Sequence, residues 1–315
     1  RGTIMAKNKE LLSKLGPFIG LVLLMVVLTF LNPSFLTVDN LLNILRQVSI
    51  SALIAFGMTF VILTGGIDLS VGSTLALTGA VAATLLAAGT DPILAMAAAI
   101  GLGFILGAIN GLIITKGKVA PFIATLATMT IYRGLTLVYT DGRPISGLGD
   151  SLSFQLFGKG YFLGIPVPVV TMILAFVLLY FILHKTTFGR RVYAVGGNEE
   201  ASKLSGINPD RVKIAVYAIT GMLAAISALI ITSRLNSAQP TAGESYELDA
   251  IAAVVLGGTS LTGGKGWIFG TLVGALIIGV LNNGMTLIGV SSFFQQVVKG
   301  IVILLAVLMD RKKTA

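Results

Sequence analysis

Few side chains in this sequence could carry out chemistry, and one group of them interrupts an apolar stretch. The run from Thr64 to Gly72 (TGGIDLSVG) places two glycines, a carboxylate and a hydroxyl between two apolar segments. Paired glycines break a helix, and irregular backbone inside a membrane is tolerated where it lines a polar path. Alternatively, Asp68 or Ser70 caps the helix that follows by accepting its free N–H groups. The residue types leave both roles open.

Neutral polar side chains within apolar segments are the other candidates for contact with a solute. Amides in such places serve either interhelical hydrogen bonds or weak contacts with a hydroxylated solute. The predicted translocation path consists of polar residues in or between the apolar segments: Asp68, Ser70, Asn110, Asn282 and Asn283. Lys299 is the deepest ionisable residue expected, in surroundings where a charge costs about 2.5–3.5 kcal/mol.

The glycine-rich stretch from Gly258 to Gly266 resembles a phosphate-binding loop but lacks its pattern. Thr259 stands where that pattern needs its first glycine, and Gly266 stands where it needs a Ser or Thr to reach magnesium. Cysteine is absent and His184 is the single histidine, so thiolate sites, disulfides and histidine clusters are excluded. We therefore expect no cofactor, metal or ATP site on this chain, and no catalytic residues.

Apolar segments must position these residues, and the composition indicates that their solvent is lipid. Hydrophobic residues make up 55% of the chain and charged residues 11%, with a mean hydropathy of +0.94. About 20 apolar residues cross a bilayer. The prediction is an all-α integral membrane protein, one transmembrane domain over residues 1–315 with about ten spans. The predicted spans are 16–31, 47–64, 71–88, 93–115, 121–139, 162–183, 212–232, 249–263, 267–288 and 293–309.

Three segments need a separate interpretation. Segment 33–46 is amphipathic and is predicted to lie along the membrane surface before the second span. Segment 249–263 is short and glycine-rich, so it is the weakest span and could be re-entrant. The apolar run from Phe18 to Leu31 follows lysines but lacks a small-residue cleavage site after it, so it is interpreted as a retained first helix.

The basic residues predict the orientation of the bundle. With ten spans and a cytoplasmic N-terminal segment (1–15), sixteen of the 22 Lys and Arg residues fall inside, and Lys299 lies in the last span. The remaining five fall outside or near the outer edge: Arg46, Arg133, Arg143, Lys159 and Arg234. This bias follows the positive-inside rule and predicts that both termini are cytoplasmic. The net charge of +9 is therefore attributed to orientation and not to nucleic acid.

The cytoplasmic loop 185–211 is predicted to hold a short helix. Asn198 is a good N-cap, Glu199 and Glu200 complement the helix start, and Gly206 can end it in a left-handed conformation. Two turns are too few to be stable alone, so the helix needs a surface to dock on. It is either part of an ordinary ordered loop or a contact surface for a cytoplasmic partner.

Glycine spacing predicts close helix packing. Gly103, Gly107 and Gly111 follow small-xxx-small spacing, as do Gly270 and Gly274, and such residues let helix backbones approach each other. We interpret them as packing grooves and not as a site.

Three stretches together carry a resemblance to a known family. They are GGIDLSVG from Gly65, AVGGNEEASKLSGI from Ala194 and DAIAAVVLGGTSLTGGKG from Asp249. In these stretches, and over nearly its whole length, the chain resembles bacterial ABC importer permeases for monosaccharides. The resemblance implies a multi-pass protein of the inner membrane that imports a pentose, most specifically D-ribose.

The resemblance also implies partners. Two copies would form the pore, a cytoplasmic ATPase subunit would bind ATP and magnesium, and an extracytoplasmic binding protein would deliver the sugar. The docking element for the ATPase would be the short helix of loop 185–211. Its predicted residues are Asn198, Glu199, Glu200, Ser202, Lys203, Leu204, Ser205 and Gly206.

Two other functions remain as alternatives. An ion-coupled secondary sugar transporter would need an intramembrane carboxylate, and Asp68 is the only one with a claim to that role. An intramembrane enzyme would need a Ser/His dyad, paired aspartates or a metal set within the spans, and the sequence offers none of these.

Overall fold

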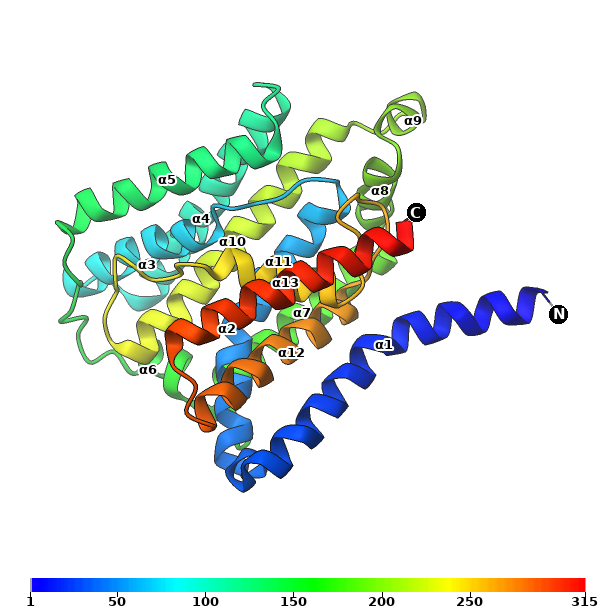
Figure 1. Cartoon of the computed structure of the whole chain (residues 1–315). Helices are drawn as coiled ribbons and strands as arrows, with labels where there is room; N and C mark the ends of the chain where they lie inside the picture. The colour runs from blue at the N-terminus through cyan, green and yellow to red at the C-terminus, as the bar shows by residue number, and fades with distance from the viewer. Residues whose placement is uncertain (1, 315) are drawn as a thin grey trace.

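The computed structural model describes the backbone of residues 2–314 and the side chains of residues 4–311. The described chain is helical almost throughout, with one short hairpin (Figure 1). Its helices are α1 (Gly2–Leu31), η1 (Pro33–Leu36), α2 (Val38–Leu63), α3 (Val71–Ala87), α4 (Pro92–Thr115), α5 (Pro121–Thr140), α6 (Leu152–Lys159), α7 (Val167–Lys185), α8 (Thr187–Gly197), α9 (Glu199–Leu204), α10 (Pro209–Leu235), α11 (Tyr246–Leu256), α12 (Ile268–Leu287) and α13 (Ser292–Thr314). Strands β1 (Tyr161–Phe162) and β2 (Ile165–Pro166) pair in antiparallel register. The predicted all-α class is confirmed.

Local sequence fixes several helix starts. Asp91 accepts hydrogen bonds from the N–H groups of Ile93 and Leu94 at the start of α4, and a proline occupies the first helical position. Asn208 caps α10 in the same way ahead of Pro209. A proline at this position loses no hydrogen bond, because the first N–H groups of a helix have no partner within the helix.

Eight of the described helices are long and apolar enough to cross a membrane, namely α1, α2, α4, α5, α7, α10, α12 and α13. The other two predicted spans contain shorter helices. Helix α3 has 17 residues, about 26 Å of helix, and α11 has 11 residues, about 17 Å. Helix α3 matches the predicted segment 71–88 within one residue and lies at the lower limit for a span, whereas α11 alone is too short for the ~30 Å of hydrocarbon. The prediction of a span over 249–263 is therefore wrong as a full helix, because the chain turns at Gly257.

The surface-lying segment predicted at 33–46 is also wrong. Only Pro33–Leu36 forms a separate turn, and α2 begins at Val38 and continues without interruption to Leu63. The Thr37 side chain accepts a hydrogen bond from the N–H of Asn40 and caps this longer helix. The amphipathic residues are thus the first turns of the second crossing.

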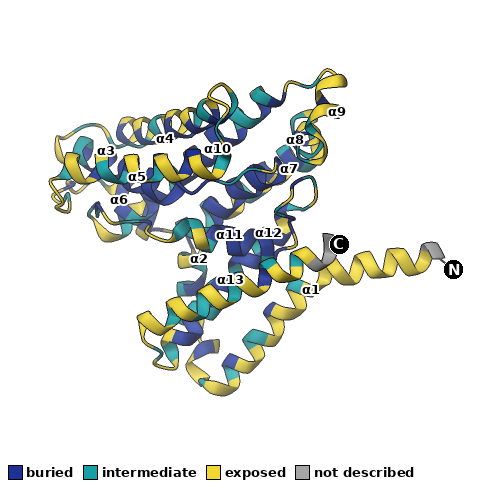
Figure 2. Ribbon diagram, turned by 45° about the horizontal axis from the view of Figure 1, so that its top comes forward, coloured by how far each residue is buried: buried dark blue, intermediate teal, exposed yellow. Residues whose placement is uncertain are grey.

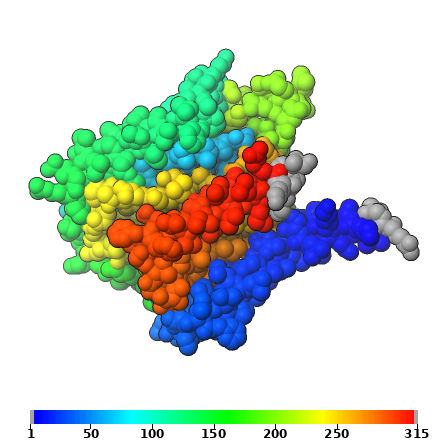
Figure 3. All heavy atoms as spheres, in the orientation of Figure 1, coloured from blue at the N-terminus to red at the C-terminus, as the bar shows by residue number. Residues whose placement is uncertain are grey.

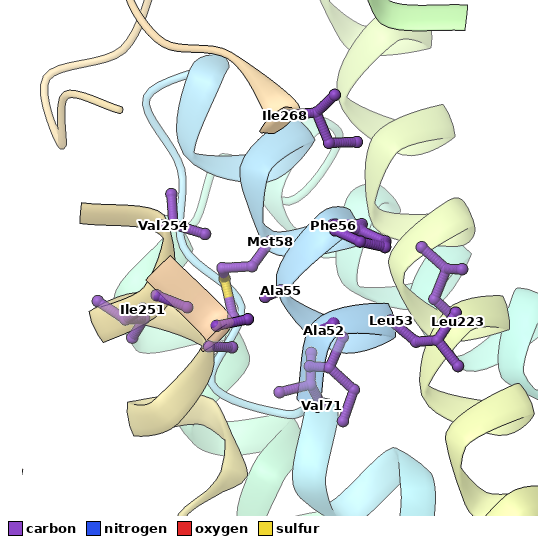
Figure 4. Packing of buried hydrophobic residues seen from close by; sticks show 14 of the residues in the cluster. Ala52, Leu53, Ala55, Phe56, Met58, Val71, Leu223, Ile251, Val254 and Ile268 are labelled. Atoms are coloured by element: carbon purple, nitrogen blue, oxygen red, sulfur yellow. The ribbon is translucent and has the colours of Figure 1, made fainter. Parts of the chain in front are cut away.

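Helix α2 lies at the centre of the core. It is buried along most of its length, and its side chains point in opposite directions to meet different neighbours (Figure 4). Leu53 and Phe56 lie toward Leu223 of α10, whereas Met58 lies toward Val254 of α11. A helix that is apolar on all sides is expected to be enclosed by other helices.

The predicted glycine grooves are confirmed as backbone contacts. A Cβ atom added to Gly107 of α4 would lie 2.1 Å from the carbonyl oxygen of Tyr217, and one on Gly103 would lie 2.4 Å from that of Gly221. Likewise, a Cβ on Gly274 of α12 would lie 1.9 Å from the carbonyl oxygen of Ala253. Only glycine permits these α4–α10 and α11–α12 approaches.

The two ends of the bundle differ. The first turns of α1 and the last described turns of α13 lie toward the same end of the bundle as α8 and α9, as the two ribbon views agree (Figure 1 and Figure 2). We call this the α9 end. Helix α6 lies at the opposite end, the α6 end. This arrangement agrees with the prediction that the termini and loop 185–211 share one side of the membrane.

Candidate translocation path and coupling surface

Two stretches of irregular backbone lead into the short helices. Residues 64–70 connect α2 to α3, and residues 236–245 connect α10 to α11. The first turn of α3 contacts the second stretch, because a Cβ on Gly72 would lie 2.1 Å from the carbonyl oxygen of Gly243. The Tyr217 hydroxyl donates to the carbonyl of Ile67 at 2.9 Å and thereby satisfies part of the first stretch. Irregular backbone at membrane depth requires such protein partners.

Three of the predicted path residues come together in a buried polar network. Asp68 Oδ1 accepts from the backbone N–H (2.9 Å) and the hydroxyl (2.6 Å) of Ser70. Asn110 donates to the Ser70 hydroxyl at 2.8 Å, and Thr128 donates to Asn110 Oδ1 at 2.6 Å. All four residues are at most 2% exposed. The network joins the break to α4 and α5, so its geometry is that of a structural connection.

The predicted capping role is met only in part. Ser70 occupies the N-cap position of α3, but its side chain accepts no hydrogen bond from the helix. Asp68 bonds to Ser70 itself and not to the first turn of α3. The carboxylate therefore holds the residue that starts the helix.

The neighbouring asparagines of α12 have different surroundings. Asn283 forms a reciprocal amide pair with Asn40 of α2, with distances of 2.8 and 3.0 Å. Asn282 lines a cavity instead, and its buried Oδ1 has no hydrogen-bond partner among the described residues. Of the two, only Asn282 is in a position to meet a solute.

This cavity has a volume of about 470 Å³ and is bounded by α2, α10, α11, α12 and α13. Its walls mix aliphatic side chains with polar ones. The polar residues that line it are Gln47, Ser51, Arg234, Tyr246, Asp249, Asn282 and Lys299. Asn282 lies five residues before the end of α12 at Leu287, and Arg234 lies at the end of α10. We call it the outer cavity, because those helix ends belong to the α6 end.

An ion pair crosses the outer cavity. Lys299 Nζ of α13 lies 3.1 Å from Oδ1 and 3.2 Å from Oδ2 of Asp249 in α11. The Asp249 side chain is 14% exposed and that of Lys299 is 28% exposed. The pair explains how the deep lysine predicted from the sequence is accommodated, since paired charges at membrane depth are far less costly than single ones.

A second hollow, of about 550 Å³, lies beside Arg133 of α5. The Arg133 guanidinium donates to the carbonyls of Pro240 (2.9 Å) and Ala242 (2.8 Å) in the irregular stretch. Glu244 and Glu247 line the same hollow. Helix α5, the chain near residue 245 and α13 all lie on one face of the molecule (Figure 3). That face therefore carries charges of both signs.

The predicted short helix forms as expected at the α9 end. Asn198 Oδ1 accepts from the N–H of Ala201 at 2.9 Å, and Gly206 ends the turn with φ +84°. Ser202 is buried, whereas Leu204 projects with 91% of its surface exposed. Glu200, Lys203 and Ser205 are also exposed beside it.

Helix α9 is joined firmly to the bundle through its neighbours. Lys213 of α10 forms an ion pair with Glu199 at 2.7 Å. Helix α8 packs against the end of α2 so closely that a Cβ on Gly196 would lie 1.6 Å from the Leu63 carbonyl oxygen. The same carbonyl accepts from the N–H of Gly264, in the loop that follows α11, at 2.9 Å. A force on α9 would therefore reach the end of α2 and the loop after α11 through short, rigid contacts.

Comparison with known proteins identifies the family. Residues 40–307 match the family described as "Branched-chain amino acid transport system / permease component". A ribose import permease protein of Bacillus subtilis (strain 168) is 67% identical over 304 residues, which are 96% of this chain and 94% of that protein. The chain belongs to this permease family.

Other relatives of the permease transport sugars according to their names. A ribose import permease protein of Escherichia coli (strain K12) is 54% identical over 97% of this chain and 96% of its own. A D-allose transport system permease protein of the same strain is 42% identical over 95% and 91%. No solved structure matches the permease.

Sequence reasoning missed several residues of the outer cavity. Gln47, Arg234 and Tyr246 line it but were not predicted to be path residues. Lys299 was noted without its partner, because 50 residues separate it from Asp249. The available signal was an acidic residue in the first turn of α11 and a lone lysine within the last apolar run of the permease. Opposite charges in separate spans are expected to pair.

Proposed function

We propose that this permease moves D-ribose inward across the bacterial inner membrane as the transmembrane subunit of an ABC importer. The observation that carries the proposal is the 67% identity to a ribose import permease over almost the full length of both chains. Identity to the allose permease is lower, at 42%. The substrate class is thus a monosaccharide and not the branched-chain amino acid in the family description.

ATP hydrolysis takes place on a separate cytoplasmic subunit in this proposal, and ATP and magnesium bind there. The exposed Leu204 side chain, with polar neighbours on α9, offers a small apolar contact surface for that subunit. The N-cap at Asn198 and the ion pair between Lys213 of α10 and Glu199 hold α9, and with it Leu204, in a fixed position. An extracytoplasmic binding protein delivers the sugar at the α6 end.

A second copy of the chain is expected to cover the face formed by α5, the 236–245 stretch and α13. Arg133 and Lys299 each lie seven residues from the α6-end terminus of their helix, about 10 Å into the bundle. Lipid against this face would leave Arg133, Glu247 and the Asp249–Lys299 ion pair beside hydrocarbon, whereas ionisable residues within spans generally face the bundle interior or a water-filled cavity. A homodimer would enclose them in a shared polar passage.

Reconstitution in vesicles tests the function. We expect vesicles that contain the permease, its ATPase and its binding protein to concentrate ribose only when ATP reaches the ATPase. Excess leucine should not compete. If vesicles with the permease alone concentrate ribose in response to a sodium or proton gradient, the chain is an ion-coupled transporter and the proposal fails.

A further inference from the structure

We propose that the outer cavity binds one neutral monosaccharide, with the Asn282 amide and the Asp249–Lys299 ion pair as its hydrogen-bonding groups. This inference rests on the proposed function and adds a discrete sugar site within the membrane. The cavity volume of about 470 Å³ lies within the usual range for small-molecule sites.

Asn282 lines the outer cavity, and a turn of its amide makes either polar atom available to a ligand. Its Oδ1 is buried and has no hydrogen-bond partner among the described residues, and an unsatisfied buried oxygen costs about 1–3 kcal/mol. No hydrogen bond from the described residues holds Oδ1, so rotation about χ2 can present either its oxygen or its NH2 group to the cavity. A sugar hydroxyl both donates and accepts, and it can satisfy either orientation. The adjacent Asn283 has no such freedom, because Asn40 engages it from both sides.

The charges of the cavity favour a neutral ligand. Asp249 and Lys299 lie 3.1 Å apart and largely cancel each other, while each keeps hydrogen-bonding capacity for a hydroxyl. A zwitterionic amino acid would have to break this pair to use it. Arg234 adds one further positive charge at the cavity wall, so an anionic sugar is the competing ligand that a test must include.

The remaining walls suit the other surfaces of a sugar. Val48, Ile231 and Ile278 supply aliphatic contact, which matches the C–H faces of a pyranose or furanose ring. Tyr246 contributes an aromatic ring, and Gln47, in the third turn of α2, adds an exposed amide. Walls that are mostly apolar, with a few convergent polar groups, are typical of small-molecule sites.

Ligand-observed NMR on the full chain in lipid nanodiscs tests the proposal directly. D-ribose, D-ribonate and L-leucine are offered separately, without binding protein or ATPase. We expect saturation transfer to ribose, with weaker or no transfer to the other two. Asn282→Leu should weaken ribose binding about threefold to tenfold, the effect of one lost hydrogen bond. Asn282→Asp, which keeps an acceptor in the same place, should weaken it less.

Asn43→Leu is the matched control. Asn43 is a partly buried asparagine of α2 that does not line the outer cavity, so its replacement should leave ribose binding unchanged. Thermal unfolding separates a ligand role from a structural one. Because Oδ1 of Asn282 has no hydrogen-bond partner among the described residues, Asn282→Leu should be at least as stable as the wild type.

If the wild type binds ribose, four outcomes would still overturn the site. They are ribose binding that Asn282→Leu leaves intact, tighter binding of ribonate than of ribose, equal loss in Asn43→Leu, and loss of binding together with lowered thermal stability. If wild-type nanodiscs bind no ribose while complete vesicles still take it up with ATP, the site is refuted and the proposed function stands. If complete vesicles fail to take up ribose, the proposed function itself fails.

Discussion

Asp249 and Lys299 show how single residues of this permease depend on partners far away in the sequence. The carboxylate lies in the first turn of an 11-residue helix, and the ammonium lies on a helix whose central residues are mostly apolar. Each charge is tolerated because the other lies 3.1 Å away. Removing one partner from such a pair leaves the other without compensation, whereas removing both costs much less.

Lys299→Met should therefore destabilise the permease by about 1–3 kcal/mol, between the values for exposed and buried pairs. The measurement is the thermal unfolding midpoint of purified protein in detergent. Adding Asp249→Asn to this variant should recover part of the loss, because no unpaired carboxylate remains. A single variant as stable as the wild type would show that the pair contributes nothing to the fold.

Asn110 connects the α2–α3 break to α4 and α5, and its loss should be structural. Asn110→Ala removes one hydrogen bond from the Ser70 hydroxyl (2.8 Å) and one from the Thr128 hydroxyl (2.6 Å), and it leaves a cavity in place of the amide. Together these losses should lower the free energy of unfolding by about 2–4 kcal/mol. Asn43→Ala, outside this network, serves as the comparison. The unfolding midpoint should fall for Asn110→Ala alone, while the ribose concentration that gives half-maximal uptake stays the same. A shift in that concentration would instead place Asn110 in the sugar path.

Local patterns predicted those features of the site that depend on neighbours in sequence. The cap at Asn198, the turn at Gly206 and the break at Gly65–Gly66 were all predicted from adjacent residues. The distinction between Asn282 and Asn283 was not, because it depends on Asn40, 243 residues away. Nor could an apolar run over 249–263 reveal where the chain turns, since apolar character is the same in a half helix and a full one.

At the scale of elements, close packing between two helices positions the groups that support the irregular backbone between α2 and α3. The α4–α10 pair brings backbone against backbone along Gly103, Gly107 and Gly111. This contact holds Tyr217 where its hydroxyl supports the carbonyl of Ile67 in the irregular stretch. Small residues on one helix therefore stabilise non-helical backbone on another.

Gly107→Ala should separate α4 from α10, since the new Cβ would lie 2.1 Å from the backbone oxygen of Tyr217. We expect a loss of about 1–3 kcal/mol from overpacking, measured as a lowered unfolding midpoint. Gly101→Ala on the same helix is the control, because nothing lies within 4 Å of its added Cβ. That control should be neutral or stabilising by up to about 1 kcal/mol. Equal behaviour of the two variants would contradict the tight α4–α10 contact.

At the scale of the whole molecule, the outer cavity and the proposed docking helix lie toward opposite ends of the bundle. Asn282 and Arg234 line the cavity near the α6-end termini of their helices, and Leu204 projects from α9. Between them, α8 and the loop before α12 both contact the carbonyl of Leu63 at the end of α2, and α2 itself lines the cavity. A displacement of α9 thus has a continuous series of packed contacts that leads to the cavity walls.

Leu204→Asp tests that connection at the α9 end, where the ATPase subunit is proposed to dock. The leucine is 91% exposed, so the substitution should leave membrane insertion and the unfolding midpoint unchanged. It places a charge in the proposed apolar dock, so ATP-driven ribose uptake in complete vesicles should fall at least about tenfold, the effect of some 1.4 kcal/mol at the contact. Leu204→Met keeps the apolar contact and should retain most of the uptake. Ribose binding to the permease alone in nanodiscs should be equal in both variants, because the outer cavity is at the other end.

Full uptake in Leu204→Asp would show that α9 is not the docking element. If Leu204→Met loses uptake to the same extent as Leu204→Asp, the contact depends on the shape of the leucine side chain and not on its apolar character.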